Sequence, residues 1–297
     1  MNPLLALLRI LTLVAGTGAA LGGLADPVTI VTFRSSESVG DGRFDYDREL
    51  LQLALVKTRE KYGPFQLKPS PVMNYSRAML SLKNNAFPNF IIKLSFADSH
   101  PRELLHGDFP LDLGIVGYRV CFIAEKNRDK VAAMTEPAQL QALTIGQGRG
   151  WTDVDVLRHN GFEVIETPMY ESLFEMVATG RFDLLCRGAN EVLAEWMEHR
   201  HIPGFELDRS LALYYPLPRF FYVHYKNAQI LQRVEEGLEL AYEDGSLMAL
   251  WEHHYQKSID FAELQKRRIF RFPNPLLKGL DANYERYLFE PFKTPSP

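Results

Sequence analysis

Apolar and polar positions alternate along this chain in two successive blocks that each combine strands with helices. In the first block, β-branched and aromatic runs predict strands, and Leu50, Leu51, Ala54 and Leu55 share one face of a predicted helix. The predicted order is a strand at 28–34, a helix at 47–62, a strand at 65–68, a helix at 76–83 and a strand at 90–96. This β-α-β-α-β order is typical of an α/β layer.

The second block begins after Pro137 and repeats the alternation. Its predicted elements are a strand at 143–145, a helix at 154–159, a strand at 162–165, a helix that Thr167 and Pro168 open and Gly180 ends, a strand at 182–186 and a helix capped by Asn190. Extended apolar segments at 117–123 and 211–220 flank this block. Two α/β units joined by two extended crossings indicate two lobes, with a cleft between them in which a ligand binds.

Two further helices are predicted at 227–244 and 246–255, and the last forty residues have the pattern of an arm that wraps around the molecule. We therefore expect residues 26–118 and 216–297 to form lobe 1, with its C-terminal arm, and residues 119–215 to form lobe 2 including the hinge strands.

Composition excludes several classes of protein. The 297 residues are 46% hydrophobic and 24% charged, which is enough apolar surface to fold and excludes disorder over most of the length. The formal charge is −4 and the basic residues are spread thinly, so we expect no nucleic-acid partner.

The first 25 residues have the pattern of a cleaved signal peptide. Arg9 is followed by an apolar run, and Gly23 and Ala25 supply small residues at the −3 and −1 positions of a cleavage site. A membrane anchor is the alternative, but a span needs about 20 strongly apolar residues and several glycines dilute this stretch. We expect an exported, periplasmic product that begins near Asp26.

The two cysteines, Cys121 and Cys186, each lie in an apolar strand-like run. Buried free cysteine behaves as a small hydrophobic residue, so we expect two unpaired thiols, with a disulfide as the alternative.

The order of these elements resembles the periplasmic solute-binding proteins of family 3, the amino-acid-binding lineage with the two-lobed type II α/β fold and its two hinge crossings. The similarity extends from Val28 to about Tyr255 and points to a branch with undefined ligand. The segments that carry it are Gly146-Gln147-Gly148 with Trp151-Thr152-Asp153, Tyr170-Glu171-Ser172-Leu173-Phe174 with Gly180-Arg181-Phe182-Asp183, and the run from Asn227 to Trp251.

The resemblance implies that lobe closure captures a small anionic or amino-acid-like molecule, which is then presented to a membrane transporter. A sensing module for a membrane receptor is the alternative. The resemblance also implies a monomer without a cofactor.

One implied ligand contact is Arg102, which stands where the family's carboxylate-binding arginine follows a lobe 1 strand, although Ser99-His100-Pro101 departs from the family's spacing. The alternative is an exposed loop arginine. The glycine-rich loop before Trp151 supplies a second set, because converging backbone N–H groups at a helix start favour an anion. Its expected ligand contacts are Gly148, Arg149, Trp151 and Thr152; a plain strand–helix turn is the alternative.

The family's ammonium-binding aspartate corresponds by position to Gly188, beside Arg187. The expected carboxylate is therefore missing, and a cleft that contains Arg102, Arg149 and Arg187 favours an acidic ligand. We count Arg187 and Gly188 as candidate ligand contacts; Glu191 or Asp153 is the alternative source of the missing carboxylate.

The chain contains neither G-x-S-x-G nor H-E-x-x-H, and we expect that it is not an enzyme. Adjacent histidines in 198–201 and 252–254 point to different helix faces, and we expect no metal site. A cleft enzyme of the dehydratase type, which some relatives of this fold are, is the remaining alternative.

Overall fold

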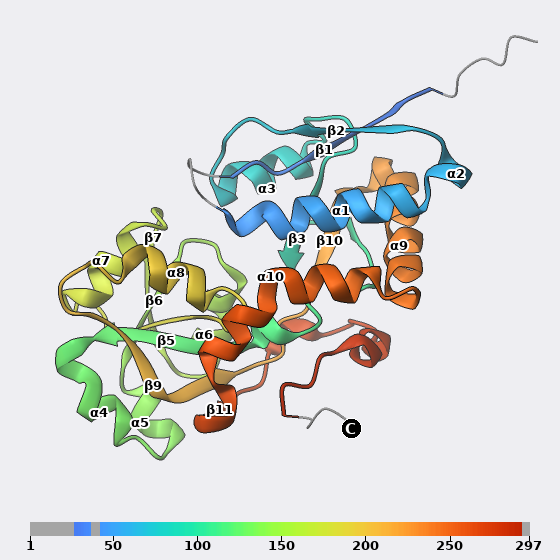
Figure 1. Cartoon of the computed structure of the whole chain (residues 1–297). Coiled ribbons are helices and arrows are strands. Elements are labelled where there is room, and N and C mark those ends of the chain that lie inside the picture. Colours follow the sequence, from blue (N-terminus) through green and yellow to red (C-terminus); the bar gives the residue numbers. More distant parts are fainter. Residues whose placement is uncertain (1–26, 37–41, 293–297) are drawn as a thin grey trace, which may run out of the picture.

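The computed structural model describes residues 27–36 and 42–292, and the strands in these ranges form two sheets (Figure 1). In spatial order, sheet A contains β2 (Phe65–Pro69), β1 (Thr29–Phe33), β3 (Ile91–Ser95), β10 (Arg219–His224) and β4 (Leu104–His106). Sheet B contains β11 (Arg268–Arg271), β9 (Phe205–Tyr214), β5 (Tyr118–Ala124), β8 (Leu184–Gly188), β6 (Thr144–Gly148) and β7 (Glu163–Thr167). The predicted signal peptide at 1–25 lies outside the described residues.

Helices surround each sheet and divide the molecule into two lobes. Around sheet A lie α1 (Asp45–Lys57), α2 (Arg59–Tyr62), α3 (Tyr75–Lys83) and α9 (Ala228–Glu243), and around sheet B lie α4 (Arg128–Ala132), α5 (Pro137–Gln141), α6 (Thr152–His159), α7 (Ser172–Ala178) and α8 (Val192–His199) (Figure 1). Helix α10 (Ser246–Ala262) packs on α1 and α9 of one lobe and on α8 of the other, so it lies at the junction.

Short 3-10 helices connect these elements. They are η1 (Gly42–Phe44), η2 (Ile115–Gly117), η3 (Glu125–Asn127), η4 (Tyr225–Asn227), η5 (Leu264–Lys266), η6 (Pro275–Leu277) and η7 (Ala282–Tyr287). In the part of the chain that the structure describes, no helix combines the length and the apolar character that a membrane span requires.

The β–α alternation predicted from the sequence is present in both lobes, with local differences at helix starts. Helix α7 begins at Ser172, four residues beyond Pro168, because a turn precedes it. Helix α8 begins at Val192 with Glu191 at its N-cap, so Asn190 is not the cap residue.

The C-terminal arm corrects the predicted lobe assignment. Strand β11 pairs in parallel with β9, and Phe270 and Phe272 pack in the core against sheet B, so the expectation that all of 216–297 belongs to lobe 1 is wrong at this strand. Residues 275–289 then return to lobe 1, where Tyr284 is buried and the Phe289 N–H donates to the Leu113 carbonyl at 2.8 Å. Apart from this assignment of β11 to lobe 2, the lobe boundaries near residues 118 and 216 remain a proposal.

The arm also lies along both segments that connect the lobes. The Phe272 N–H donates to the Tyr214 carbonyl (2.8 Å), and Asn274 Nδ2 donates to the Pro216 carbonyl (2.8 Å). At the other crossing, the rings of Phe292 and Tyr118 have centroids 5.6 Å apart. A third segment therefore bridges the two lobes beside the two crossings.

The two cysteines form a disulfide, so the expectation of unpaired thiols is wrong. Cys121 on β5 and Cys186 on β8 are register partners in an antiparallel pair, which brings their side chains together on one face of the sheet. The apolar runs around each cysteine predict strands but contain nothing that shows these strands to be neighbours.

Candidate functional site

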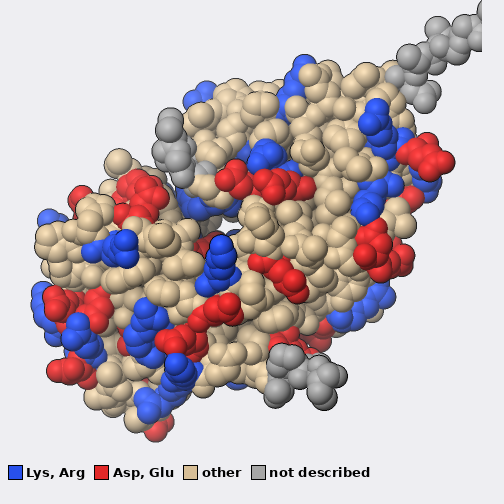
Figure 2. Space-filling model, in the orientation of Figure 1, with Lys and Arg blue, Asp and Glu red and all other residues tan. Residues whose placement is uncertain are grey.

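A cavity of about 730 Å³, counting the part open to solvent, lies between the lobes; we call it the cleft cavity. Figure 2 shows a hollow between the two halves of the molecule, with acidic and basic side chains at its rim. Lobe 1 contributes Arg34, Arg43, Phe44, Asp47, Tyr75, Lys93, Leu94, Ser95 and Arg219, and lobe 2 contributes Trp151, Thr152, Asp153, Arg187 and Glu191.

The lobe 1 residues reach the cavity because several element ends meet there. Arg34 directly follows β1, and Lys93 lies on β3, the parallel neighbour of β1. In open α/β sheets, ligands bind outside the carboxyl ends of the strands. Asp47 joins them from the first turn of α1, and Arg219 opens the antiparallel strand β10.

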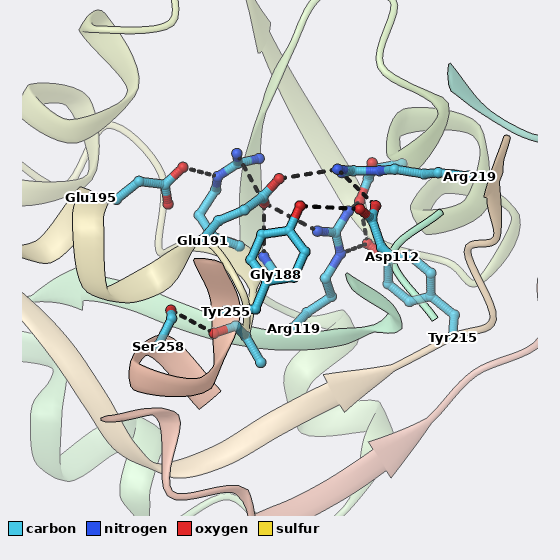
Figure 3. A network of polar contacts seen from close by, with 12 residues as sticks. Asp112, Arg119, Gly188, Glu191, Glu195, Tyr215, Arg219, Tyr255 and Ser258 are labelled. Carbon is cyan, nitrogen blue, oxygen red and sulfur yellow. Dashed lines mark hydrogen bonds and ion pairs between the residues drawn. The ribbon is translucent and has the colours of Figure 1, made fainter. Parts of the chain in front are cut away.

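One part of the cavity floor is a buried cluster in lobe 2 (Figure 3). The Arg119 guanidinium forms an ion pair with Asp153, and Arg119 Nε donates to the Tyr215 hydroxyl at 3.2 Å. The same hydroxyl donates to Asp153 Oδ1 at 2.6 Å. Asp153, in the first turn of α6, is thus held by two partners.

A second part connects the lobes through Glu191. Arg187 Nη2 lies 3.1 Å from Glu191 Oε2, and Arg219 Nη1 of lobe 1 lies 3.2 Å from Glu191 Oε1 (Figure 3). The Gly188 N–H also donates to Glu191 Oε2 at 3.1 Å. Arg187 Nε donates to Glu195 Oε1 at 2.7 Å. One arginine therefore holds both Glu191, at the N-cap of α8, and Glu195, in its first turn.

A third part lies in lobe 1, where Lys93 Nζ is 2.5 Å from Asp47 Oδ1 and 2.9 Å from Asp112 Oδ1. Arg219 Nη1 lies 3.5 Å from Asp112 Oδ2, and the Tyr255 hydroxyl donates to Asp112 Oδ1 at 3.2 Å. Asp112 is fully buried, so these partners offset the cost of removing its charge from water.

The buried carboxyl groups titrate differently because their surroundings differ. Burial alone would raise the pKa of Glu191, but the positive charges of Arg187, Arg219 and Arg119 outweigh it and hold this pKa well below its usual value. Burial dominates at Glu195 and raises its pKa, with Arg187 acting in the opposite direction. Glu191 is therefore ionised, whereas Glu195 binds a proton more readily than a solvated glutamate.

Aromatic rings and guanidinium groups stack along the walls. The Arg43 guanidinium carbon of lobe 1 lies 3.8 Å from the centre of the Tyr170 ring of lobe 2, and that of Arg187 lies 4.6 Å from the Trp151 ring. Both distances are within the range of a cation–π interaction. Arg43 and Tyr170 thus join the lobes at the edge of the cavity.

The structure brings together most of the residues that the sequence singles out. Trp151, Thr152 and Arg187 line the cleft cavity, and Gly148 and Arg149 line an adjoining pocket together with Trp151. Gly188 contributes through its N–H to Glu191. Arg102 is exposed in the turn before β4, and it is not among the described residues that line these two cavities.

Sequence reasoning missed the lobe 1 contribution, above all Arg34, Lys93 and Arg219. The position of Arg34 at the carboxyl end of the first predicted strand is a signal that identifies it in retrospect. Arg219 gives no such signal, because its place depends on the antiparallel pairing of β10 with β3.

Comparison with protein-family models finds no match, and neither does comparison with curated proteins. Solved structures do match. An ancestral arginine-binding protein bound to arginine has a TM-score of 0.57 at 13% identity, over 76% of this chain and 98% of that one. A histidine kinase sensor domain with similarity to periplasmic binding proteins has a TM-score of 0.56 at 14% identity, over 76% and 96%.

An ancestral amino-acid-binding protein, described as a precursor of cyclohexadienyl dehydratase, has a TM-score of 0.54 at 12% identity, over 76% of this chain and 95% of that one. Together these matches show the fold: this chain has the two-lobed α/β fold of periplasmic binding proteins, as the sequence resemblance predicts.

Proposed function

We propose that this chain is an exported solute-binding protein that captures a small carboxylate-bearing molecule between its lobes and presents it to a membrane transporter. The observation that carries the proposal is the cleft cavity itself, which residues of both lobes line. A ligand that contacts both lobes favours the closed arrangement by its differential contacts, which is how such a protein responds to its solute. The Cys121–Cys186 disulfide fits an oxidising compartment outside the cytoplasm.

The charge of the cleft supports an anionic ligand. The described side chains that line it include five basic and three acidic residues: Arg34, Arg43, Lys93, Arg187 and Arg219 against Asp47, Asp153 and Glu191. A carboxylate offsets part of this excess of positive charge, which lowers the cost of closing the cleft around it.

The test is a calorimetric titration of the purified protein with small carboxylates. We expect Arg34→Gln to weaken carboxylate binding roughly ten- to a hundredfold, since a hydrogen bond to a charged group contributes about 1.5–3 kcal/mol. Arg102→Gln is the matched control, because it removes an exposed guanidinium outside the cavity. A loss confined to Arg102→Gln would support Arg102 as the contact instead, and no loss in either variant would overturn the proposed site.

The sensing and enzymatic alternatives have distinct outcomes. Mass spectrometry of the molecules released on denaturation identifies what the protein carries, and prolonged incubation shows whether that molecule is returned unchanged. A converted product would favour a cleft enzyme of the dehydratase type. Co-purification with a sensor kinase rather than a permease would favour the sensing module.

A further inference from the structure

One ion pair joins the two lobes directly across the cleft. Glu191 of lobe 2 is the N-cap residue of α8, and its Oε1 lies 3.2 Å from Nη1 of Arg219, which opens β10 of lobe 1. Both side chains are largely withdrawn from water, since Glu191 is 16% exposed and Arg219 is 17% exposed. Because both partners belong to the chain itself, the contact acts on the separation of the lobes whether or not a solute is bound.

The carboxylate of Glu191 lies among three guanidinium groups. Besides Arg219, Arg187 Nη2 lies 3.1 Å and Arg119 Nη1 lies 3.8 Å from Glu191 Oε2 (Figure 3). Both arginines belong to lobe 2 and are almost fully buried, so water screens their charges little. Without the carboxylate, Arg219 of one lobe would face two guanidinium groups of the other, and their mutual repulsion would favour separation of the lobes.

Helix α10 holds the turn that carries Glu191. The Ser258 hydroxyl of α10 donates to the Ala189 carbonyl at 2.7 Å and accepts from the Leu193 N–H at 3.1 Å (Figure 3). These two backbone groups lie on either side of Glu191 in the chain. The carboxylate is therefore held at a fixed place relative to α10.

The same helix also positions the lobe 1 partner. The Tyr255 hydroxyl of α10 donates to Asp112 Oδ1 at 3.2 Å, and Trp251 Nε1 donates to the Asp112 carbonyl at 3.2 Å. Asp112 Oδ2 in turn lies 3.5 Å from Arg219 Nη1. Both members of the interlobe ion pair are thus placed, through one or two contacts, by a single helix that packs on both lobes.

We propose that Glu191 is an internal counter-ion that keeps the lobes closed in the solute-free protein, through its ion pair with Arg219. The inference concerns the protein before it captures anything, and so goes beyond the proposed function. An anion that enters the cleft has to compete with Glu191 for the guanidinium groups of Arg219 and Arg187. The chain therefore carries its own inhibitor of anion binding.

The test measures the separation of the lobes in protein that has been unfolded, dialysed and refolded to remove solutes. Spin labels at Arg77→Cys on α3 and Asp155→Cys on α6, both exposed, report the distance between lobes by pulsed electron paramagnetic resonance. The natural cysteines are buried in their disulfide, so the labels react with the introduced thiols. We expect one narrow distance distribution for the natural protein. A long or broad distribution would overturn the inference and leave the proposed function standing.

Glu191→Gln tests the counter-ion itself. A second, longer distance should appear, because the ratio of open to closed molecules rises roughly ten- to a hundredfold when a hydrogen-bonded charge is lost. Glu175→Gln, at an exposed residue of α7, is the matched control and should keep the single distance. A single short distance in Glu191→Gln would show that α10 and the arm close the lobes unaided, which would overturn the inference.

Chemical rescue distinguishes the lost charge from a damaged fold. In Glu191→Ala the shortened side chain makes room for a small carboxylate between the arginines. Added formate should therefore restore the short distance in this variant and leave the natural protein unchanged, whereas chloride at the same ionic strength controls for screening. If formate closes Glu191→Ala no better than chloride does, closure does not depend on a carboxylate at this place and the inference is overturned.

Discussion

At the residue scale, Glu235 of α9 is a carboxyl group far from the cleft whose ionisation opposes folding. Its Oε2 accepts from the N–H groups of Asp108 (2.7 Å) and Phe109 (2.9 Å), and its Oε1 has no partner among the described residues. Burial raises the pKa of Glu235 from 4.5 to about 7, against the lowering effect of the two N–H groups. Gly107 makes room for this carboxyl, since a Cβ there would lie 1.8 Å from Glu235 Oε1.

We therefore predict that Glu235→Gln stabilises the protein more at pH 8 than at pH 5. The quantity compared is the difference in the free energy of unfolding between the variant and the natural protein. With its folded pKa raised, Glu235 contributes full stability below about pH 4.5, and this contribution is lost as the pH rises through 7. The natural protein loses about 3 kcal/mol of unfolding free energy in this way. The glutamine variant does not lose it, because its side chain does not ionise. Urea unfolding at both pH values measures it. Glu243→Gln, exposed on the same helix, should show no such difference, and an equal effect of Glu235→Gln at both pH values would contradict the prediction.

At this scale the sequence predicts part of the lobe 2 side of the cleft and none of the lobe 1 side. Trp151, Thr152 and Arg187 belong to local motifs, in which residues close in the chain are close in space, and the structure places them in the cavity lining. Arg219 reaches the cavity only through the pairing of β10 with β3, more than 120 positions apart along the chain. A pairing at that distance leaves no local pattern, which is why the lobe 1 side of the cleft was missed.

At the element scale, helices α1 and α9 approach closely at Gly237. A Cβ at Gly237 would lie 2.1 Å from the carbonyl oxygen of Ala54, so the helices would have to separate. We predict that Gly237→Ala lowers the free energy of unfolding by about 1–3 kcal/mol or more, despite the higher helix propensity of alanine. Gln232→Ala, on the exposed face of α9, should change it by less than about 0.5 kcal/mol. Equal urea midpoints for the two variants would refute the close contact.

The disulfide between β5 and β8 gives a second prediction for the elements. The two cysteines are 65 residues apart in the chain, so the bond restricts the unfolded state. The double variant Cys121→Ala/Cys186→Ala should lose about 2–4 kcal/mol of unfolding free energy. Reductant should destabilise the natural protein and leave the double variant unchanged. Equal stability of both proteins under oxidising conditions would show that the bond does not form.

The order of the elements along the chain was predictable from the sequence. Which strands lie side by side in the sheets was not. Short-range patterns identify the strands and helices of both lobes because the periodicity of apolar residues is local. The pairing of β11 with β9 and the Cys121–Cys186 bond both depend on which strands lie side by side. The predicted lobe assignment of the arm and the expected free thiols are both wrong for this reason.

At the scale of the whole molecule, the arm supports both lobes. Deleting residues 273–297 keeps β11 but removes the buried Tyr284 ring and the backbone contact from Phe289 to Leu113. We predict a loss of about 3 kcal/mol or more of unfolding free energy, from the apolar area exposed on lobe 1. We also expect a larger radius of gyration in small-angle scattering. Deleting only residues 293–297 is the control, and unchanged values for the longer deletion would contradict the prediction.

The position of the arm beside both crossings bears on how long a captured molecule stays. Two strands that cross between lobes act as a pair of flexible pivots, and they permit the lobes both to swing apart and to twist. The contacts of Phe272 and Asn274 at one crossing and of Phe292 at the other add a third tether. Opening then has to loosen these contacts as well as those to the solute. Under the proposed function, we expect the arm to slow the escape of a bound molecule without touching it, so that residence time depends on a segment outside the binding cavity.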